Sequence, residues 1–353
     1  MDQYEFAVPG AVPSTPDYRD KKDEQLAMAF PYPVTYETDL TMIPVFNQGK
    51  IGLCTGASLT TIVEWLYFKK TGKHVPLSRR FLYSVTKNMI DKNKMEGSSL
   101  RSALKAAYDV GICTEATFPS SPDGLNHEQY IDINAIPAKA FAEAKEFQIG
   151  GYVSVPVDKD SLCAGIYKYG MLYSRVVVGP TWWQGTDGVN TWDPAKINPI
   201  RYPDVIISGH AIVDKGYDNL ELTLRNSWSA AWANKGDADR SIIGYAPTEA
   251  WGVTLKLVVN DLPPAGDFHH SFKPTARGEV SEEVKNLQIA LMISGDLEYV
   301  QPIDRGTYGQ KTQDAVYKYQ LRKGIPMGWA EKYIYKGRYC GLKTCAQLNV
   351  DFR

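Results

Sequence analysis

The sequence predicts an α+β domain followed by a small all-α module, and three observations indicate this. Apolar residues recur at helical spacing in the first third of the chain, before about residue 110. Runs rich in β-branched residues dominate from Gly150 to about residue 258. Beyond a Pro-rich segment near residue 263, helical spacing returns together with an internal repeat. At 353 residues the chain is long enough for two domains.

Composition excludes several classes of function. The formal net charge is −1, with acidic and basic residues interspersed, so we expect neither nucleic acid nor a membrane surface as a partner. The N-terminus is acidic and has no apolar run of signal-peptide type, and no run approaches the roughly 18 residues that span a bilayer. We therefore expect synthesis in the cytoplasm without a signal peptide, a monomer, and neither a cofactor nor a metal site.

The five cysteines are an odd number and widely spaced, unlike the disulfide framework of a small secreted protein. At least one thiol is therefore free. Cys113 and Cys163 lie in apolar contexts and are predicted core residues. Cys340 and Cys345 are close in sequence, which leaves a local disulfide open, while no neighbouring His supports a metal site.

Residues 1–40 are rich in Pro, Asp, Tyr and Lys without periodicity, and we interpret them as an extended N-terminal arm. The arm could cross a substrate cleft as an inhibitory latch or lie on the surface, and the sequence leaves both open.

The first predicted helix begins at Cys54, buries the face that carries Leu59 and Val63, and ends at Gly72. A second is predicted over residues 99–109, with Gly111 as its C-terminal signal. Strands are predicted over residues 152–157, 175–178, 205–207, 210–213, 220–224 and 255–258.

Residues 261–277 have linker composition and separate the predicted α+β domain, 41–260, from a module over 278–353. In the module, the stretches 306–316 and 337–348 resemble each other: each has a Gly-bounded turn and then a Thr near a helix start. We expect two similar helical units packed together.

The chemistry is concentrated around Cys54, which opens the first predicted helix, with Gln48 six residues before it. A helix N-terminus favours a thiolate by at most about 2 kcal/mol. Lowering a thiol pKa from about 8.5 to about 4 takes roughly 6 kcal/mol, which is more than the helix N-terminus supplies. Activation of Cys54 therefore requires a base. His210 begins an apolar strand, and Asn226 follows the next strand. Two adjacent antiparallel strands would place this pair side by side, with Trp228 covering their hydrogen bond from water.

The Gln48-to-Cys54 segment, Gly209-His210-Ala211 and Asn226-Ser227-Trp228, in that order, resemble the papain-like cysteine peptidases. The resemblance implies a two-subdomain fold, helical plus antiparallel β-barrel-like. It also implies Cys54 as nucleophile, His210 as base and later acid, Asn226 as the residue that orients His210, and Gln48 with the Cys54 backbone N–H as the oxyanion hole.

Substrate-binding residues carried over from the same resemblance are Gly97, Ser98, Gly209 and Trp228. The chain departs from the family at Ile51, where many relatives have a disulfide-forming Cys, and at Thr55, where an aromatic residue is usual. Trp182 and Trp183 either floor the cleft or form a packed aromatic pair.

The module resembles the peptidoglycan-binding domains of wall hydrolases, on the helical positions Val284, Leu287 and Gln288 and on the turn that contains Gly306 and Tyr308. This resemblance implies a bacterial cell-wall partner; the alternative is a helical appendage that packs on the catalytic domain. We hypothesise a cysteine endopeptidase that cuts peptidoglycan stem peptides through a Cys54 thioester, as a phage lysin or virion-associated wall hydrolase. The alternatives are a general protein-cleaving protease tethered to the wall and a non-catalytic wall-binding protein.

Overall fold

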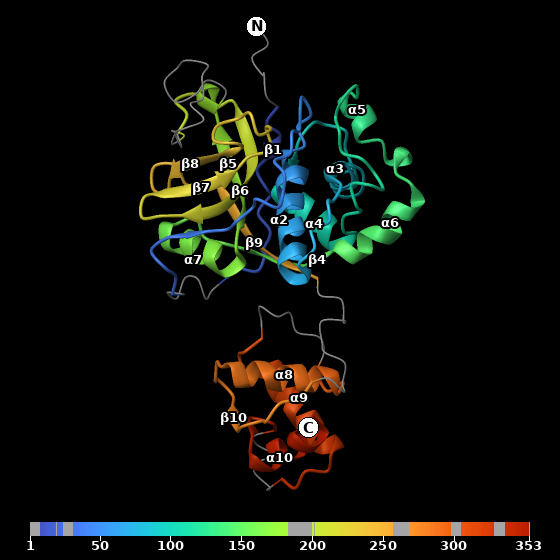
Figure 1. The fold of residues 1–353 in the computed structure, drawn as a ribbon, viewed down its shortest axis with the longest axis vertical. Helices are drawn as coiled ribbons and strands as arrows, with labels where there is room; N and C mark the ends of the chain where they lie inside the picture. The colour runs from blue at the N-terminus through green and yellow to red at the C-terminus, as the bar shows by residue number, and fades with distance from the viewer. Residues whose placement is uncertain are drawn as a thin grey trace. The chain divides into compact units, whose positions relative to one another are not determined.

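The computed structural model describes residues 8–18, 20–23, 31–182, 200, 202–256, 268–297, 305–327 and 336–352. The chain divides into two compact units, Met1–Lys256 and Leu257–Arg353 (Figure 1). The start of the predicted linker, up to residue 267, lies outside the described residues.

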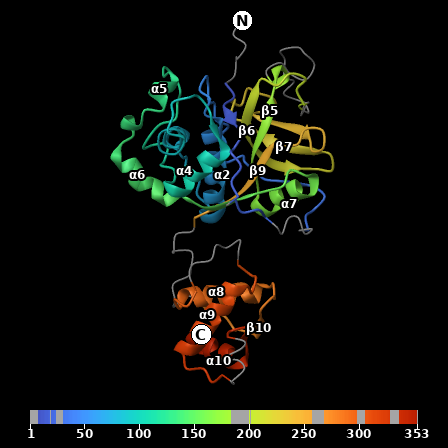
Figure 2. The same cartoon turned by 180° about the vertical axis from the view of Figure 1, so that it is seen from behind.

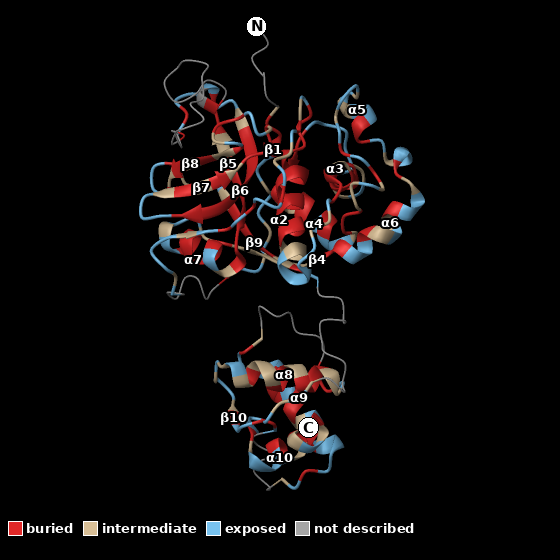
Figure 3. Cartoon of the chain, viewed as in Figure 1, coloured by how far each residue is buried: buried red, intermediate tan, exposed pale blue. Residues whose placement is uncertain are grey.

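The helical half of the first unit is built around α2 (Cys54–Thr71). Its first twelve residues are buried, and it ends where Gly72 adopts a left-handed φ of 69°, as predicted (Figure 3). The predicted second helix is α4 (Leu100–Asp109), capped by the Ser99 side chain. The other helices of this half are α3 (Arg79–Val85), the π-helix η1 (Thr86–Asp91), α5 (His127–Tyr130), η2 (Ile133–Ala135), α6 (Ala138–Ala144) and η3 (Lys145–Phe147).

The β half is a seven-stranded antiparallel sheet in the order β4-β9-β5-β6-β7-β8, with β2 paired to β6. Figure 2 shows α2 between this sheet and the helices α4, α5 and α6. The sheet's elements, with the helices of this half, are β2 (Tyr36–Glu37), β4 (Ile149–Ser154), α7 (Lys159–Tyr169), β5 (Leu172–Val178), η4 (Pro180–Trp182), β6 (Ser208–Tyr217), β7 (Glu221–Arg225), β8 (Asp237–Ser241) and β9 (Glu249–Leu255).

One core joins the two halves. Leu59 and Val63 of α2 lie in the same buried cluster as Val213 of β6 and Trp251 of β9. Because the nucleophile candidate begins α2 and the histidine candidate lies on β6, this shared core brings the two segments together.

Two strand predictions are wrong in detail. Residues 205–207 are exposed and form no strand, because β5 ends at Val178, whose register partner is Ser208. A β-branched run without a neighbouring strand cannot form a ladder. The last strand of the sheet, β9, begins at Glu249, well before the predicted start at 255, and its small residues Ala250 and Gly252 conceal that start in the sequence, while residues 257–258 of the predicted strand lie outside the described residues.

The second unit contains β10 (Thr275–Ala276), α8 (Glu282–Ile293), α9 (Gln310–Arg322), β11 (Tyr339–Cys340) and α10 (Leu342–Asp351). It is helical with one short antiparallel ladder, β10 on β11. Phe272 lies in its core, so residues 272–277, predicted as linker, belong to this unit.

The internal repeat is visible in its hydrogen bonds. Gln288 Nε2 donates to the Thr307 carbonyl at 3.1 Å and to Thr312 Oγ1 at 2.8 Å. Gln320 Nε2 donates to the Tyr339 carbonyl at 3.2 Å and to Thr344 Oγ1 at 2.9 Å. The sequence separations, 19 and 24 residues, are the same in both copies. Each copy therefore uses a buried helix glutamine to hold the turn that starts the next helix.

Candidate active site

Cys54 occupies the first position of α2, and its side chain is fully buried. No side chain caps this helix start and its first turn contains no acid, so its backbone N–H groups remain available to an anion. Burial raises the pKa of the Cys54 thiol, and hydrogen bonding from backbone groups of Ala211 and Gly10 opposes that rise. The thiol therefore lies beside the β6 segment that contains His210.

The structure brings His210 and Asn226 together. His210 lies on β6 and is fully buried, and Asn226 directly follows β7, the antiparallel neighbour. His210 Nε2 lies 2.7 Å from Asn226 Oδ1. The same Asn226 oxygen accepts a bond from the Ser227 backbone N–H at 2.7 Å, which orients the amide.

This hydrogen bond selects the histidine tautomer. Since Asn226 Oδ1 can only accept, the proton of a neutral His210 ring must be on Nε2. Nδ1 then carries a lone pair, and it has no hydrogen-bond partner among the described residues. Burial lowers the pKa of His210 to about 4, while the Asn226 bond acts in the opposite direction. Because both groups are buried, the Cys54 thiol and the His210 imidazole are both neutral at pH 7.

Gln48 is fixed by the loop that contains Asn226. Its side-chain oxygen accepts from Ser227 Oγ at 2.7 Å, and its backbone N–H donates to the Ser227 carbonyl at 3.0 Å. With Oε1 held by Ser227, the Gln48 amide group donates to the carbonyls of Ile51 and Val8, each at 2.9 Å. Ser227 is a positioning residue that the sequence analysis did not single out; its place next to Asn226 was the available signal.

Aromatic side chains cover the His210–Asn226 bond. Trp228 is fully buried with its ring centroid 4.8 Å from that of His210, and Trp182 meets the same imidazole edge-on at 5.7 Å. Trp232, which the sequence analysis missed, stacks on Trp182 at 5.6 Å. Trp182 therefore packs in an aromatic cluster with Trp228 and Trp232, whereas the predicted Trp182–Trp183 pair stays a prediction because Trp183 lies outside the described residues. Trp228 packs behind the histidine with no exposed surface.

The predicted substrate-binding segment, Gly97 and Ser98, lies between η1 and α4. The Gly97 N–H donates to Tyr83 Oη at 2.9 Å, and the Gly97 carbonyl accepts from the buried Lys87 ammonium at 2.7 Å. Lys87 belongs to the π-helix, a distortion that often occurs at functional sites. Tyr83 and Lys87 thus hold the backbone N–H and the backbone carbonyl of Gly97. Sequence patterns gave no signal for either residue.

The N-terminal arm occupies the site. β1 (Ala11–Val12) pairs in parallel with β3 (Ser98–Ser99), and the Ser98 N–H donates to the Gly10 carbonyl at 2.8 Å. The Val8 carbonyl accepts from Gln48 Nε2. The arm backbone therefore contacts both the predicted substrate-pairing segment and the predicted oxyanion donor.

Further contacts tie the arm to the β half. Arg175 Nε of β5 donates to the Ala11 carbonyl at 2.9 Å, and the Ser14 N–H donates to the Glu249 carboxylate of β9 at 3.2 Å. Arg175 is nearly buried and also donates to Thr248 Oγ1 at 2.8 Å. The arm thus bridges the helical and β halves.

Three glycines leave room for this backbone. A Cβ on Gly97 would lie 2.4 Å from the Gly10 carbonyl oxygen, and one on Gly209 would lie 2.2 Å from that of Ala11. A Cβ on Gly10 itself would lie 2.3 Å from the Gly52 carbonyl oxygen. Because real Cβ atoms do not approach backbone oxygens this closely, side chains at these positions would displace the arm.

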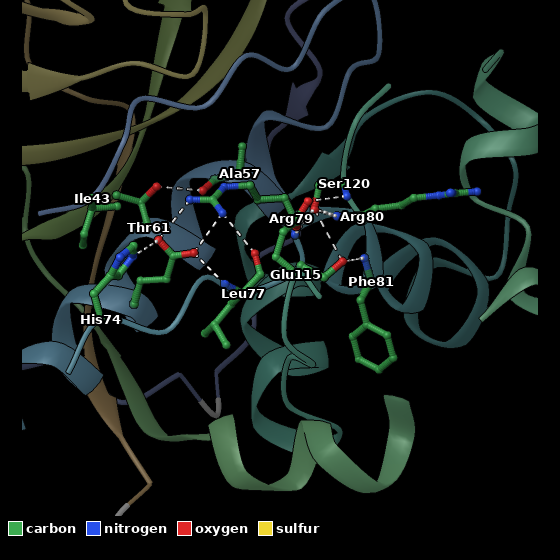
Figure 4. A network of polar contacts seen from close by, with 12 residues as sticks. Ile43, Ala57, Thr61, His74, Leu77, Arg79, Arg80, Phe81, Glu115 and Ser120 are labelled. Carbon is green, nitrogen blue, oxygen red and sulfur yellow. Dashed lines mark hydrogen bonds and ion pairs between the residues drawn. The ribbon is translucent and has the colours of Figure 1, made fainter. Parts of the chain in front are cut away.

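A buried ion pair fastens α2 to the start of α3. Glu64 and Arg79 make two hydrogen bonds, at 2.8 and 3.1 Å, with both side chains nearly inaccessible. The same carboxylate accepts from the Leu77 N–H at 2.7 Å and lies 3.4 Å from His74 Nε2 (Figure 4). This network fixes the direction of α2, whose first residue is Cys54.

Two further observations concern the described residues. Their His, Cys, Asp and Glu side chains form no group of three that could hold a metal ion. None of their helices combines the length and apolar character needed to cross a membrane.

A helical half and an antiparallel sheet, with a cysteine at the start of the central helix next to a His–Asn pair, define a cysteine peptidase fold. The chain belongs to the papain family of cysteine proteases, whose model matches residues 34–239. Residues 280–327 match the model of a peptidoglycan binding domain.

Among curated relatives, cathepsin J of Mus musculus is 24% identical over 223 residues, 63% of this chain and 59% of the relative. Cathepsin Q of Rattus norvegicus is 24% identical over 210 residues, which are 59% of this chain and 57% of that relative. The chain thus spans about three fifths of the length of these relatives.

Among solved structures, xylellain, a cysteine protease from Xylella fastidiosa, is similar with a TM-score of 0.57 and 22% identity, over 71% of this chain and 96% of that one. Procathepsin B S9 from Trypanosoma congolense gives a TM-score of 0.53 and 12% identity, over 71% of this chain and 87% of that one. These similarities concern the fold.

Proposed function

We propose that this chain is a latent cysteine endopeptidase in which Cys54 is the nucleophile and residues 8–14 block the cleft until they are displaced. The main support is the hydrogen bond from Gln48 Nε2 to the Val8 carbonyl. The Val8 carbonyl oxygen already accepts the hydrogen bond that Gln48 Nε2 would donate to a substrate carbonyl. Peptide-bond cleavage therefore requires the arm to leave.

In the proposed reaction, His210 Nδ1 takes the Cys54 proton and the thiolate attacks the substrate carbonyl carbon. The oxyanion formed accepts hydrogen bonds from Gln48 Nε2 and the Cys54 backbone N–H. The C–N bond then breaks, the amine leaves with the proton from His210, and a thioester remains. Water, deprotonated by His210, hydrolyses the thioester and restores the thiol. Asn226 holds the imidazole throughout.

The latch is tested by Gly10→Val. The added side chain would collide with the Gly52 carbonyl, so the arm should leave its place. Hydrolysis of a fluorogenic peptide should rise at least about tenfold, the equivalent of about 1.4 kcal/mol. Val12→Ala, at an exposed arm position, is the matched control and should behave as wild type. Equal rates in all three chains would refute the latch without bearing on Cys54.

Catalysis itself is tested by thiol labelling in the Gly10→Val background. Rapid alkylation of Cys54 at mildly acidic pH that disappears on adding His210→Ala supports the proposed pair. Sluggish labelling with and without His210 would argue against it.

For the substrate, we propose peptides of the bacterial cell wall, and the support is the peptidoglycan binding domain match. Such an enzyme fits a phage lysin or a virion-associated wall hydrolase. Gly10→Val chains with Cys54 intact or changed to Ala are incubated with purified sacculi and with casein. Release of soluble wall peptides only by the chain with intact Cys54 is the expected result.

A second candidate is a protein-cleaving protease that the C-terminal unit tethers to the wall. The support is the match to cathepsins, at low identity. Cleavage of casein with no release from sacculi would favour this function over the lysin. In either case, the full Cys54→Ala chain should pellet with sacculi.

A further inference from the structure

Two cysteines of the C-terminal unit lie in contact. Cys340 ends β11 and Cys345 lies in the first turns of α10, and their sulfur atoms are 3.7 Å apart. Both side chains are buried, at 1% and 3% exposure. No metal-binding group of three His, Cys, Asp or Glu side chains includes them within the described part of the chain. Among these residues, the pair is therefore a dithiol and not part of a metal centre.

The backbone around the pair is already held. Cys340 is paired in the ladder to Thr275, and the Cys345 N–H donates to the Gly341 carbonyl at 2.9 Å. A disulfide needs the sulfurs at about 2.05 Å, so from 3.7 Å they must approach by about 1.7 Å.

The internal repeat shows that the fold does not require thiols here. The positions equivalent to Cys340 and Cys345 in the first copy are Tyr308 and Gln313. There, Tyr308 Oη donates to the Gly337 carbonyl at 2.6 Å and Gln313 Oε1 accepts from Arg277 at 3.0 Å. The first copy thus uses these two positions for hydrogen bonds to residues outside it, Gly337 and Arg277. The second copy has two adjacent sulfur atoms at the corresponding place.

We propose that Cys340 and Cys345 are a redox modification site that closes to a disulfide and locks the second repeat of the C-terminal unit. The oxidant class is a small disulfide such as glutathione disulfide. The Cys345 thiolate attacks one of its sulfurs, and one glutathione leaves as thiolate. The Cys340 thiolate then attacks the Cys345 sulfur, and the second glutathione leaves. The pair loses two electrons and two protons, and one glutathione disulfide becomes two glutathiones.

Electrostatics assign the order of attack. The hydrogen bond between the two sulfurs lowers the pKa of Cys345 and raises that of Cys340. While the two sulfurs are in contact, Cys345 is therefore the more acidic of the two thiols.

Burial determines when the bond forms. Because both sulfurs are inaccessible in the folded unit, exchange takes place during local opening of the C-terminal unit. Cys54 is also fully buried, next to the arm residue Gly10. An oxidising medium can therefore close the Cys340–Cys345 pair while the proposed nucleophile stays reduced.

The test incubates the folded full chain in glutathione redox buffer and, in parallel, in excess dithiothreitol. Intact mass should fall by about 2 Da in the oxidised sample, and peptide mapping should join Cys340 to Cys345 while Cys54 remains free. Thermal unfolding of the C-terminal unit should shift upward by roughly 5 °C on oxidation. Cys340→Ser and Cys345→Ala should each abolish the shift.

Two results would overturn the proposal. One is a pair of free thiols, or glutathione adducts only, after oxidative incubation of the folded wild-type chain. The other is a cross-link that leaves the thermal transition unchanged. Mass mapping of the wild-type chain does not depend on whether either variant folds.

Discussion

His210 has its only described hydrogen bond through Nε2, and burial lowers its pKa to about 4. Cys54, beside the same strand, has a raised pKa because it too is buried. Closure by the arm thus favours the neutral forms of both groups. A thiolate–imidazolium pair needs the solvent and charge that opening the cleft provides.

The lowered pKa of His210 predicts acid sensitivity. An unfolded histidine titrates near 6.5, so between pH 6.5 and 4 the unfolded chain binds a proton that the folded chain does not. The free energy of unfolding of the first unit should fall by about 3 kcal/mol over this window and stay level above it. Urea unfolding at several pH values measures this. A His210→Gln chain should lose most of the slope; an unchanged slope would contradict the assignment.

The Ser227 hydroxyl predicts a graded effect on rate. In the Gly10→Val background, Gln48→Ala should lower kcat by about 10² to 10³, the effect of losing one oxyanion donor. Ser227→Ala leaves the Gln48 amide in place but unoriented, so the loss should be smaller, roughly tenfold. Ser227→Thr should restore the rate, and KM should change little. A Ser227→Ala chain with only KM altered would rule out the positioning role.

At the scale of elements, α2 could be predicted almost completely from the sequence, because its apolar periodicity and its terminal Gly72 are local signals. The strand over 205–207 could not be assigned correctly, because a strand depends on a neighbour that periodicity does not reveal. The π-helix at Lys87 likewise had no sequence signal.

The Glu64–Arg79 pair predicts a large stability effect at the α2–α3 junction. Arg79→Met removes the guanidinium from a buried carboxylate, which keeps only the Leu77 N–H and His74 as partners, and should lower the free energy of unfolding of the first unit by about 3 to 5 kcal/mol. Changing both residues to Met should restore part of it. The exposed pair Lys105–Asp109 of α4 is the matched control, where Lys105→Met should cost under about 0.5 kcal/mol. Similar losses at both sites would contradict the burial argument.

At the scale of the whole molecule, the two units have separate cores, one assembled around α2 and the sheet and the other around α8, α9 and α10. Separate cores allow a separate task for each unit. The family matches divide the same way, with the protease match ending at 239 and the peptidoglycan binding match beginning at 280.

Removing the second unit therefore predicts a loss of targeting without a loss of chemistry. A chain ending at Lys256 with Gly10→Val should hydrolyse the fluorogenic peptide at the rate of the full Gly10→Val chain. Its Cys54→Ala form should no longer sediment with sacculi, whereas the full Cys54→Ala chain should. Sedimentation of both would place wall affinity in the first unit.

Sequence alone determined the class of chemistry and the order of the parts, because Cys54 opens a predicted helix, His210 and Asn226 stand at the ends of neighbouring predicted strands, and the motifs that contain them and Gln48 resemble the papain-like peptidases. It left open whether the arm lies in the cleft, since an extended segment has no periodicity and its place depends on distant partners. The tertiary structure decided this: carbonyls of Val8 and Gly10 find donors at Gln48 and Ser98 only after both halves have folded. Ser227, Tyr83 and Lys87 emerged from the same long-range packing.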